Sequence, residues 1–232
     1  MKRVQLEAIG WVAAGAALAA FVSLPPLGGA AALAYLVTSN VLLLRGMRRR
    51  GVDRFGPADV VTELRSTLVG VITGLVAASF VTQVEPALLV ALVVPALALD
   101  AIDGWVARRT RTTSELGARF DMEVDAFLLL VLSVYVAAGM GAWVLAIGGM
   151  RYAFVAAGWM LPWFRRRLPP RYWRKVVTAF AGIALATAAS GLLPGVDTAF
   201  VLVAVLLLIE SFGRDILWLR RSSVAQLLTH SK

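Results

Sequence analysis

The chain alternates long apolar runs with short polar or charged breaks, and this pattern restricts the folds that it can adopt. Eight runs are each long enough, at about 20 residues, to cross the hydrocarbon core of a bilayer as a helix. They cover approximately residues 6–23, 29–45, 60–81, 86–103, 121–140, 142–163, 175–193 and 197–217. Because backbone polar groups inside a bilayer must find partners within the protein, we expect an all-α fold, a polytopic membrane helical bundle.

Composition supports this class and excludes others. Hydrophobic residues make up 59% of the 232 residues, against roughly half in a soluble domain. The chain has no cysteine, which excludes disulfides and thiolate metal sites, and we expect its one histidine, His230, to be solvated. The N-terminal stretch resembles a signal peptide, but another apolar run follows it instead of a polar domain, so we expect a retained first span.

The net charge of +9 is unevenly distributed among the breaks. Lysine and arginine gather before the first span and after the second, fourth, sixth and eighth, whereas the opposite breaks contain neither residue. The positive-inside rule therefore predicts that both termini are cytoplasmic, and we expect an integral protein of a prokaryotic cell membrane. Such a basic face suits anionic membrane lipids. Because the basic residues are dispersed among separate breaks, we expect no nucleic-acid partner.

The break around residues 98–127 contains four aspartates that the helical period places in pairs. Asp100 and Asp103 are three residues apart and share one helix face, while Asp121 and Asp125 are four apart and share another. The polar stretch "RRTRTTSELGAR" between the pairs is long enough for a turn that folds the second helix back against the first. We therefore expect all four carboxylates to converge near the cytoplasmic membrane boundary.

Four carboxylates in a partly dry site would repel one another unless a cation joined them. Oxygen ligands without histidine or cysteine indicate Mg²⁺ or Mn²⁺, and four carboxylates are enough to bridge two ions. Beside several arginines, such a site suits the binding of a diphosphate and a displacement at phosphorus. Nearby Gly104, Ala107 and Gly117 would let a ligand approach the backbone closely. The alternative is a set of exposed charges at the membrane surface.

The complete pattern of these residues resembles the signature of the CDP-alcohol phosphotransferases, also called CDP-alcohol phosphatidyltransferases. It reads Asp100-x2-Asp103-Gly104-x2-Ala107-Arg108-x8-Gly117-x3-Asp121-x3-Asp125. Upstream, Asp59-x2-Thr62-x2-Arg65 resembles the family's Asn-x2-Thr-x2-Arg segment, with Asp59 in place of the commoner asparagine. Downstream, Lys175-x2-Thr178 resembles a Lys-x2-Thr element at the start of the family's fifth helix. The resemblance covers roughly residues 57–217 as a six-helix core.

This resemblance suggests a division of the chain into three parts. Residues 1–50 would form a two-helix transmembrane extension, residues 51–220 the six-helix core, and residues 221–232 a cytoplasmic tail. The extension is an addition to the family core.

The resemblance implies an enzyme of phospholipid synthesis. The donor would be a CDP-linked lipid, usually CDP-diacylglycerol, and an alcohol acceptor would attack its lipid-side phosphorus with release of CMP. The metal ligands would be Asp100, Asp103, Asp121 and Asp125, and Asp125 would also act as general base. The implied substrate-binding residues are Asp59, Thr62, Arg65, Gly104, Ala107, Arg108, Gly117, Lys175 and Thr178.

Arg151 falls near the middle of the sixth span, where an isolated charge is costly. We predict that it lines the acceptor pocket, and the alternative is an ion pair with Glu123 or Glu210. The acceptor itself stays open among glycerol phosphate, inositol phosphate, phosphatidylglycerol and another polyol.

Two other classes of function compete with this prediction. A prenyltransferase also uses Mg²⁺ and a diphosphate, but its aspartate-rich motifs lie in two separated loops. An ion-coupled transporter would place its acids at the midplane of the membrane instead of at one boundary.

Gly70-x3-Gly74 suits either a homodimer contact or close packing within one bundle.

Overall fold

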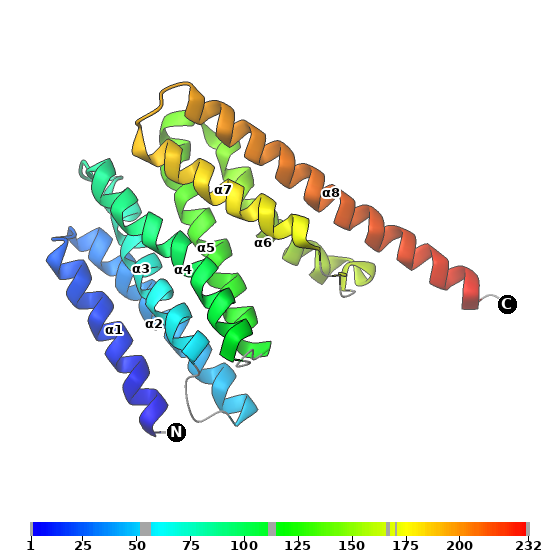
Figure 1. Ribbon diagram of the computed structural model, residues 1–232, viewed down its shortest axis with the longest axis horizontal. Helices are drawn as coiled ribbons and strands as arrows, with labels where there is room; N and C mark the ends of the chain where they lie inside the picture. Colours follow the sequence, from blue (N-terminus) through cyan, green and yellow to red (C-terminus); the bar gives the residue numbers. More distant parts are fainter. Residues whose placement is uncertain (1, 52–56, 111–114, 166–167, 170, 231–232) are drawn as a thin grey trace.

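The computed structural model describes residues 2–51, 57–110, 115–165, 168–169 and 171–230, and within these ranges it contains only helices and their connections (Figure 1). The elements are α1 (Lys2–Phe21), α2 (Pro26–Arg50), α3 (Pro57–Ala78), α4 (Pro86–Thr110), α5 (Glu115–Met140), η1 (Ala142–Val144), α6 (Leu145–Met160), η2 (Pro162–Arg165), α7 (Tyr172–Ser190) and α8 (Val196–His230).

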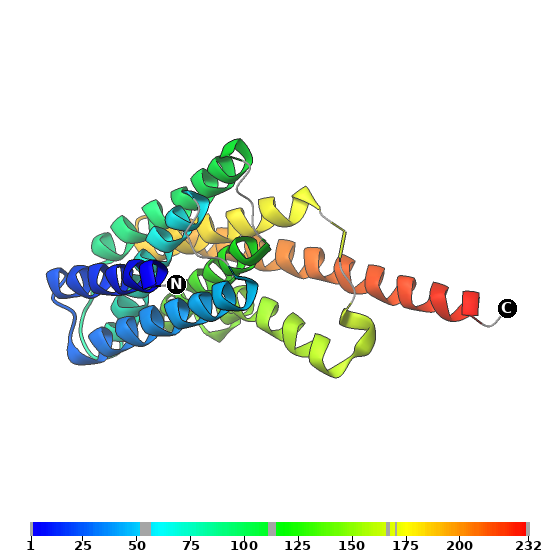
Figure 2. The same ribbon diagram turned by 90° about the horizontal axis from the view of Figure 1, so that it is seen from below.

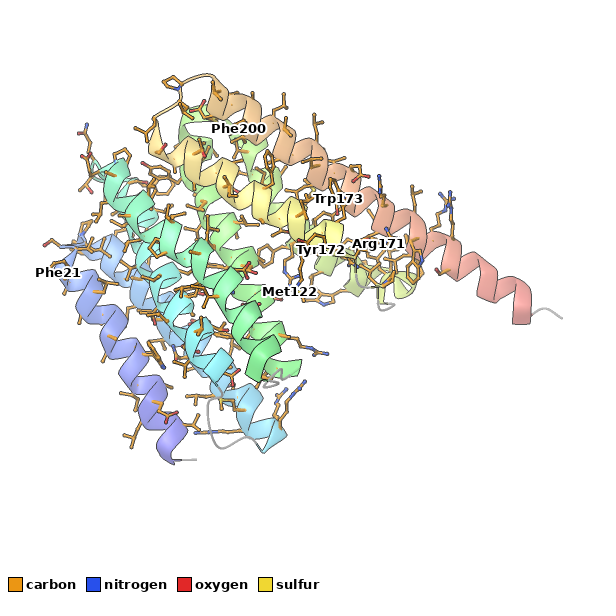
Figure 3. The ribbon with its side chains drawn as sticks, viewed as in Figure 1. Phe21, Met122, Arg171, Tyr172, Trp173 and Phe200 are labelled. Atoms are coloured by element: carbon orange, nitrogen blue, oxygen red, sulfur yellow. The ribbon has the colours of Figure 1, made fainter. Side chains whose placement is uncertain are left out.

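Six of the described helices are long and apolar enough to cross a membrane. They are α1, α2, α3, α5, α6 with its preceding turn, and α8. The apolar part of α4, Pro86–Asp100, is shorter than these six. Large apolar side chains such as Phe21 (Figure 3), Leu42 and Leu206 are exposed on the outside of the bundle, as they are in a protein whose solvent is lipid. The predicted polytopic helical membrane bundle is therefore confirmed.

Helix α3 lies at the centre of the bundle. Its apolar span is 67% buried, a larger share than in any of the other candidate spans, and it packs against α1, α2, α4 and α5. The main core joins side chains of α3, α4, α5, η1, α6, α7 and α8. Helices α1 and α2 lie side by side along one flank of this core (Figures 1 and 2).

Glycines allow α2 and α3 to pack closely. A Cβ atom added to Gly28 would lie 2.6 Å from the Gly74 carbonyl oxygen, and one added to Gly70 would lie 2.7 Å from Leu36 of α2. Backbones this close leave room only for hydrogen at both positions. Gly70 and Gly74 therefore serve packing within one bundle, and the possible homodimer stays a prediction.

The helices that contain the aspartates extend beyond the apolar spans. Helix α4 continues to Thr110 and α5 begins at Glu115, whereas the apolar runs end near 103 and begin near 121. Charged side chains at a bilayer edge do not interrupt the backbone hydrogen bonds of a helix, so apolarity marks the membrane boundary and not the helix end. The aspartates consequently lie on regular helices, which fixes their directions.

Glycines with positive φ follow several helices, among them α2 and α5. Gly51, with φ of 65°, ends α2 at the predicted boundary of the N-terminal extension, and Gly141, with φ of 100°, separates α5 from η1 and α6. Helix α8 has no such break near residue 220. It continues through the predicted tail to His230, and its C-terminal part projects beyond the other helices (Figures 1 and 2).

Candidate active site

A buried arginine joins the helices of the acidic motif. The Arg65 side chain is 0% exposed, and its Nη1 donates a hydrogen bond to Asp100 Oδ1 at 2.9 Å. Its Nη2 forms ion pairs with Asp121 and, at 3.1 Å, with Asp125 Oδ1. The same Nη2 donates to the Asp121 backbone oxygen at 3.2 Å. One side chain of α3 therefore contacts the acids of both α4 and α5.

The three carboxylates are close enough to share a cation. One oxygen each from Asp100, Asp121 and Asp125 lies within 4.8 Å of the others. Ligands at about 2.1 Å from Mg²⁺ in an octahedron stand about 3 to 4.2 Å apart, so side-chain shifts of less than about an ångström would bring these oxygens onto one ion. The oxygen-only donor set also matches a hard divalent cation.

The charge of the cluster favours such an ion. Three carboxylates and one guanidinium leave a net charge of −2, and the acids are only 46%, 30% and 29% exposed. Arg65 offsets part of the repulsion among the carboxylates, and the remaining charge equals that of one divalent cation with opposite sign.

Helical spacing explains how α3 presents its part of the site. Asp59, Thr62 and Arg65 occur at intervals of three residues, which places them along one side of the first turns of α3. Thr62 is buried and Asp59 is half-buried. All three belong to the segment singled out from the sequence, and Arg65 contacts the aspartates directly.

The comparison with known families decides the assignment. The family model described as CDP-alcohol phosphatidyltransferase matches residues 56–210, about two thirds of the chain. The chain belongs to the CDP-alcohol phosphatidyltransferase family. Members of this family transfer a phosphatidyl group from a CDP-alcohol to another alcohol and generally use a divalent metal. No curated protein and no solved structure matches the chain.

The matched range contains every predicted site residue of this CDP-alcohol phosphatidyltransferase. Asp103, Gly104, Ala107 and Arg108 lie on α4, but their side chains fall outside the described part of the structure, as do residues 111–114. Gly117 lies in the first turn of α5, one turn before Asp121. The structure thus brings together three of the four predicted metal ligands, and the contribution of Asp103 stays a prediction.

Lys175 and Thr178 lie on α7, which packs against α4 and α5. The Thr178 hydroxyl donates to the Arg174 carbonyl oxygen at 2.9 Å within its own helix, and Lys175 is exposed. Their predicted part in substrate binding stays a prediction.

Arg151 of α6 forms an ion pair with Glu123 of α5. This is one of the two partners named as the structural alternative, and it explains how the membrane protein tolerates the charge. The contact joins α6 to α5 at Glu123, two residues after Asp121. Because 57% of the Glu123 side chain is exposed, the pair lies at the surface of the bundle, and the predicted acceptor role is untested.

Two features were absent from the sequence interpretation. The first is the direct pairing of Arg65 with the carboxylates, since the sequence indicated only a role towards the donor. The second is an ionic group in the second half of α8, where Arg171 and Arg174 pair with the buried Asp215 at 3.7 Å and 3.5 Å. In the sequence Asp215 is one of several charged residues of α8, and no local signal marks it as buried.

Proposed function

We propose that this CDP-alcohol phosphatidyltransferase moves the phosphatidyl group of CDP-diacylglycerol to the hydroxyl of an alcohol, with release of CMP, at the cytoplasmic face of a prokaryotic membrane. The observation that supports the proposal best is the convergence of Asp100, Asp121 and Asp125 on the buried Arg65. The basic residues at the same ends of the helices support the cytoplasmic orientation.

The residues of α4 and α5 would hold two ions, Mg²⁺ or Mn²⁺, with Asp103 as the fourth carboxylate. When bound, such ions neutralise the donor's diphosphate and polarise the phosphorus under attack. Asp100 on α4 and Asp121 on α5 are proposed metal ligands. Both carboxylates form ion pairs with Arg65.

Asp125 would touch metal and accept the proton of the acceptor hydroxyl. The hydroxyl oxygen then forms a bond to the lipid-side phosphorus, and the bond from that phosphorus to the CMP oxygen breaks. Asp125 is partly exposed, so an acceptor can reach it, and its carboxylate is oriented by Arg65 at 3.1 Å.

The donor's polar part would be bound by residues that surround the acids. Arg65 and Arg108 supply positive charge for the diphosphate, and Thr62 supplies a hydroxyl for hydrogen bonding. The small residues of the motif leave space for the nucleotide. The remaining residues proposed to bind substrate are Asp59, Gly104, Ala107, Gly117, Lys175 and Thr178, with Arg151 facing the acceptor.

A CMP-release assay tests the proposal. Purified protein receives CDP-diacylglycerol, Mn²⁺ or Mg²⁺, and in turn glycerol phosphate, inositol phosphate, phosphatidylglycerol or a neutral polyol. We expect CMP release with one class of acceptor, and loss of release by at least about 100-fold in Asp121→Asn. A parallel reaction with an isoprenyl diphosphate and an aromatic acceptor tests the prenyltransferase alternative.

Asp197→Asn is the matched control for this assay. Asp197 lies at the start of α8, where its Oδ1 accepts hydrogen bonds from the backbone nitrogens of Gly195 at 2.9 Å and Thr198 at 2.6 Å. Asparagine can accept the same bonds, so we expect normal CMP release from this variant. Release by Asp121→Asn at the rate of this control would refute the assigned site.

A further inference from the structure

The N-terminal extension, α1 and α2, precedes the segment that the family model matches, yet it contacts helices of the candidate site. Helix α2 packs along α3, which contains Arg65, and also reaches α5, which contains Asp121 and Asp125. The residues of α5 in contact with α2 include Leu116, Phe120 and Phe127, which lie on either side of the two aspartates. This placement raises the question of what the added helices do for the site.

Tyr35 of α2 joins the two site helices. Its ring stacks on Phe127 of α5, with centroids 4.7 Å apart and an interplanar angle of 22°. Its hydroxyl lies 3.4 Å from Ser66 Oγ on α3. Ser66 follows Arg65 directly, and Phe127 lies two residues after Asp125. A single side chain from outside the matched segment therefore contacts the neighbours of two site residues.

The direction of these contacts indicates support from behind the site. Residues two apart on a helix point to nearly opposite sides, about 200° apart, so Tyr35 packs on the side of α5 that faces away from the Asp125 carboxylate. A stacked pair of this kind limits the rotation of α5 about its axis. Rotation of α5 would move Asp121 and Asp125 relative to Asp100.

A second contact fixes the beginning of α5. Val4, Leu43 and Met47 of the extension form a buried cluster with Leu44, Leu116 and Phe120. Leu116 and Phe120 precede Gly117 and Asp121 directly in the chain. The fit is close, since a Cβ atom added to Gly46 would lie 2.6 Å from Leu116 Cδ1.

Electrostatic repulsion among the acids gives such support a role. Among the described residues, the three acids and Arg65 have a net charge of −2, and repulsion between Asp100 of α4 and the two acids of α5 favours separation of these helix ends. Apolar packing against α2 opposes that movement without adding charge. Such packing would act on the distance between carboxylates, and cation affinity depends on that distance.

We propose that α2 is a positioning element of the active site, and that Tyr35 and the contact of Gly46 with Leu116 hold α5 where its carboxylates bind a divalent cation together with Asp100. This inference rests on the proposed metal-dependent function. Tyr35 is a positioning residue, since it contacts neither the carboxylates nor, by this proposal, the substrate.

Direct titration of Mn²⁺ by electron paramagnetic resonance tests the proposal on the full chain in detergent. We expect Tyr35→Leu, which removes the stacked ring, to weaken Mn²⁺ binding about tenfold, as for other residues that orient metal ligands. Tyr35→Phe keeps the ring and removes the hydroxyl, so a loss of about threefold is expected. Leu42→Ala is the control, because Leu42 lies on the same helix with 58% of its surface exposed.

A second pair of variants tests the contact at the beginning of α5. Gly46→Ala places a methyl group against Leu116, whereas Gly29→Ala places one where no atom lies within 4 Å, and both glycines are on α2. We expect weaker Mn²⁺ binding, by about threefold, only in Gly46→Ala. This pair decides the question if Tyr35→Leu does not fold.

The outcomes separate this inference from the proposed function. A merely structural role would lower the melting temperature of the Tyr35 and Gly46 variants and leave their Mn²⁺ affinity at the wild-type value, which would overturn the inference. CMP release by the wild type together with that result would leave the proposed function standing. Mn²⁺ binding that responds as expected, without CMP release from any acceptor, would sustain the inference and refute the function.

Discussion

Replacement of Arg65 by methionine gives a quantitative prediction, because methionine keeps much of the side-chain length and removes the charge. The variant leaves Asp100, Asp121 and Asp125 without the cation that contacts all three. Removing one partner of a buried pair costs about 3–5 kcal/mol, and the partial exposure of these carboxylates reduces this to about 2 kcal/mol. For a chain of this size, about 2 kcal/mol corresponds to a decrease in Tm of roughly 4–8 °C.

The measurement is thermal unfolding in detergent, followed by tryptophan fluorescence, with EDTA and then with excess Mn²⁺. In EDTA the variant should unfold roughly 4–8 °C below the wild type. In Mn²⁺ the difference should shrink to within about 2 °C, because divalent cations neutralise the same carboxylates and stabilise the folded state by binding to it.

Arg174→Met is the control for this experiment. It removes the 3.5 Å ion pair with Asp215, a carboxylate of α8 that is not part of the acidic cluster. Its decrease in Tm should be the same in EDTA and in Mn²⁺. If the decrease caused by Arg65→Met were also the same in both buffers, the reasoning that Arg65 and the metal neutralise the same charges would be refuted.

Two further predictions concern α6. Gly148→Ala should destabilise the protein by about 1–3 kcal/mol, since a Cβ atom there would overlap the Leu130 backbone, whereas Gly149→Ala, with no atom within 4 Å, should unfold near the wild-type temperature. Equal melting temperatures for the two variants would contradict the close packing of α5 and α6. Arg151→Leu should raise the KM for the acceptor at least about tenfold with little change in the KM for the donor, and an unchanged acceptor KM would assign Arg151 to its ion pair with Glu123 alone.

Much of the architecture was predictable because it depends on local properties. Membrane spans are recognised by length and apolarity, which are read directly from the chain. The pairing of Asp121 with Asp125 on one helix face follows from the helical period alone. Their meeting with Asp100 followed from a single assumption, namely that the polar stretch between the helices reverses the chain.

The contacts that were not predicted depend on how helices rotate against one another. Arg65 could have faced lipid, solvent or donor from its place in the sequence, and only the packing of α3 against α4 and α5 directs it to three carboxylates. The stacking of Tyr35 on Phe127 likewise has no local signal, since both residues read as ordinary apolar positions in their spans. Gly70 and Gly74 carried a signal for close approach, but the partner helix was decided by the fold.

The contact of one internal guanidinium with three acids also bears on the order of events in the cell. A chain that contains its own counter-charge can complete its tertiary structure in the bilayer before any ion is supplied. When the metal is scarce, the protein would then stay folded but inactive until the metal binds, and it would not misassemble and be degraded.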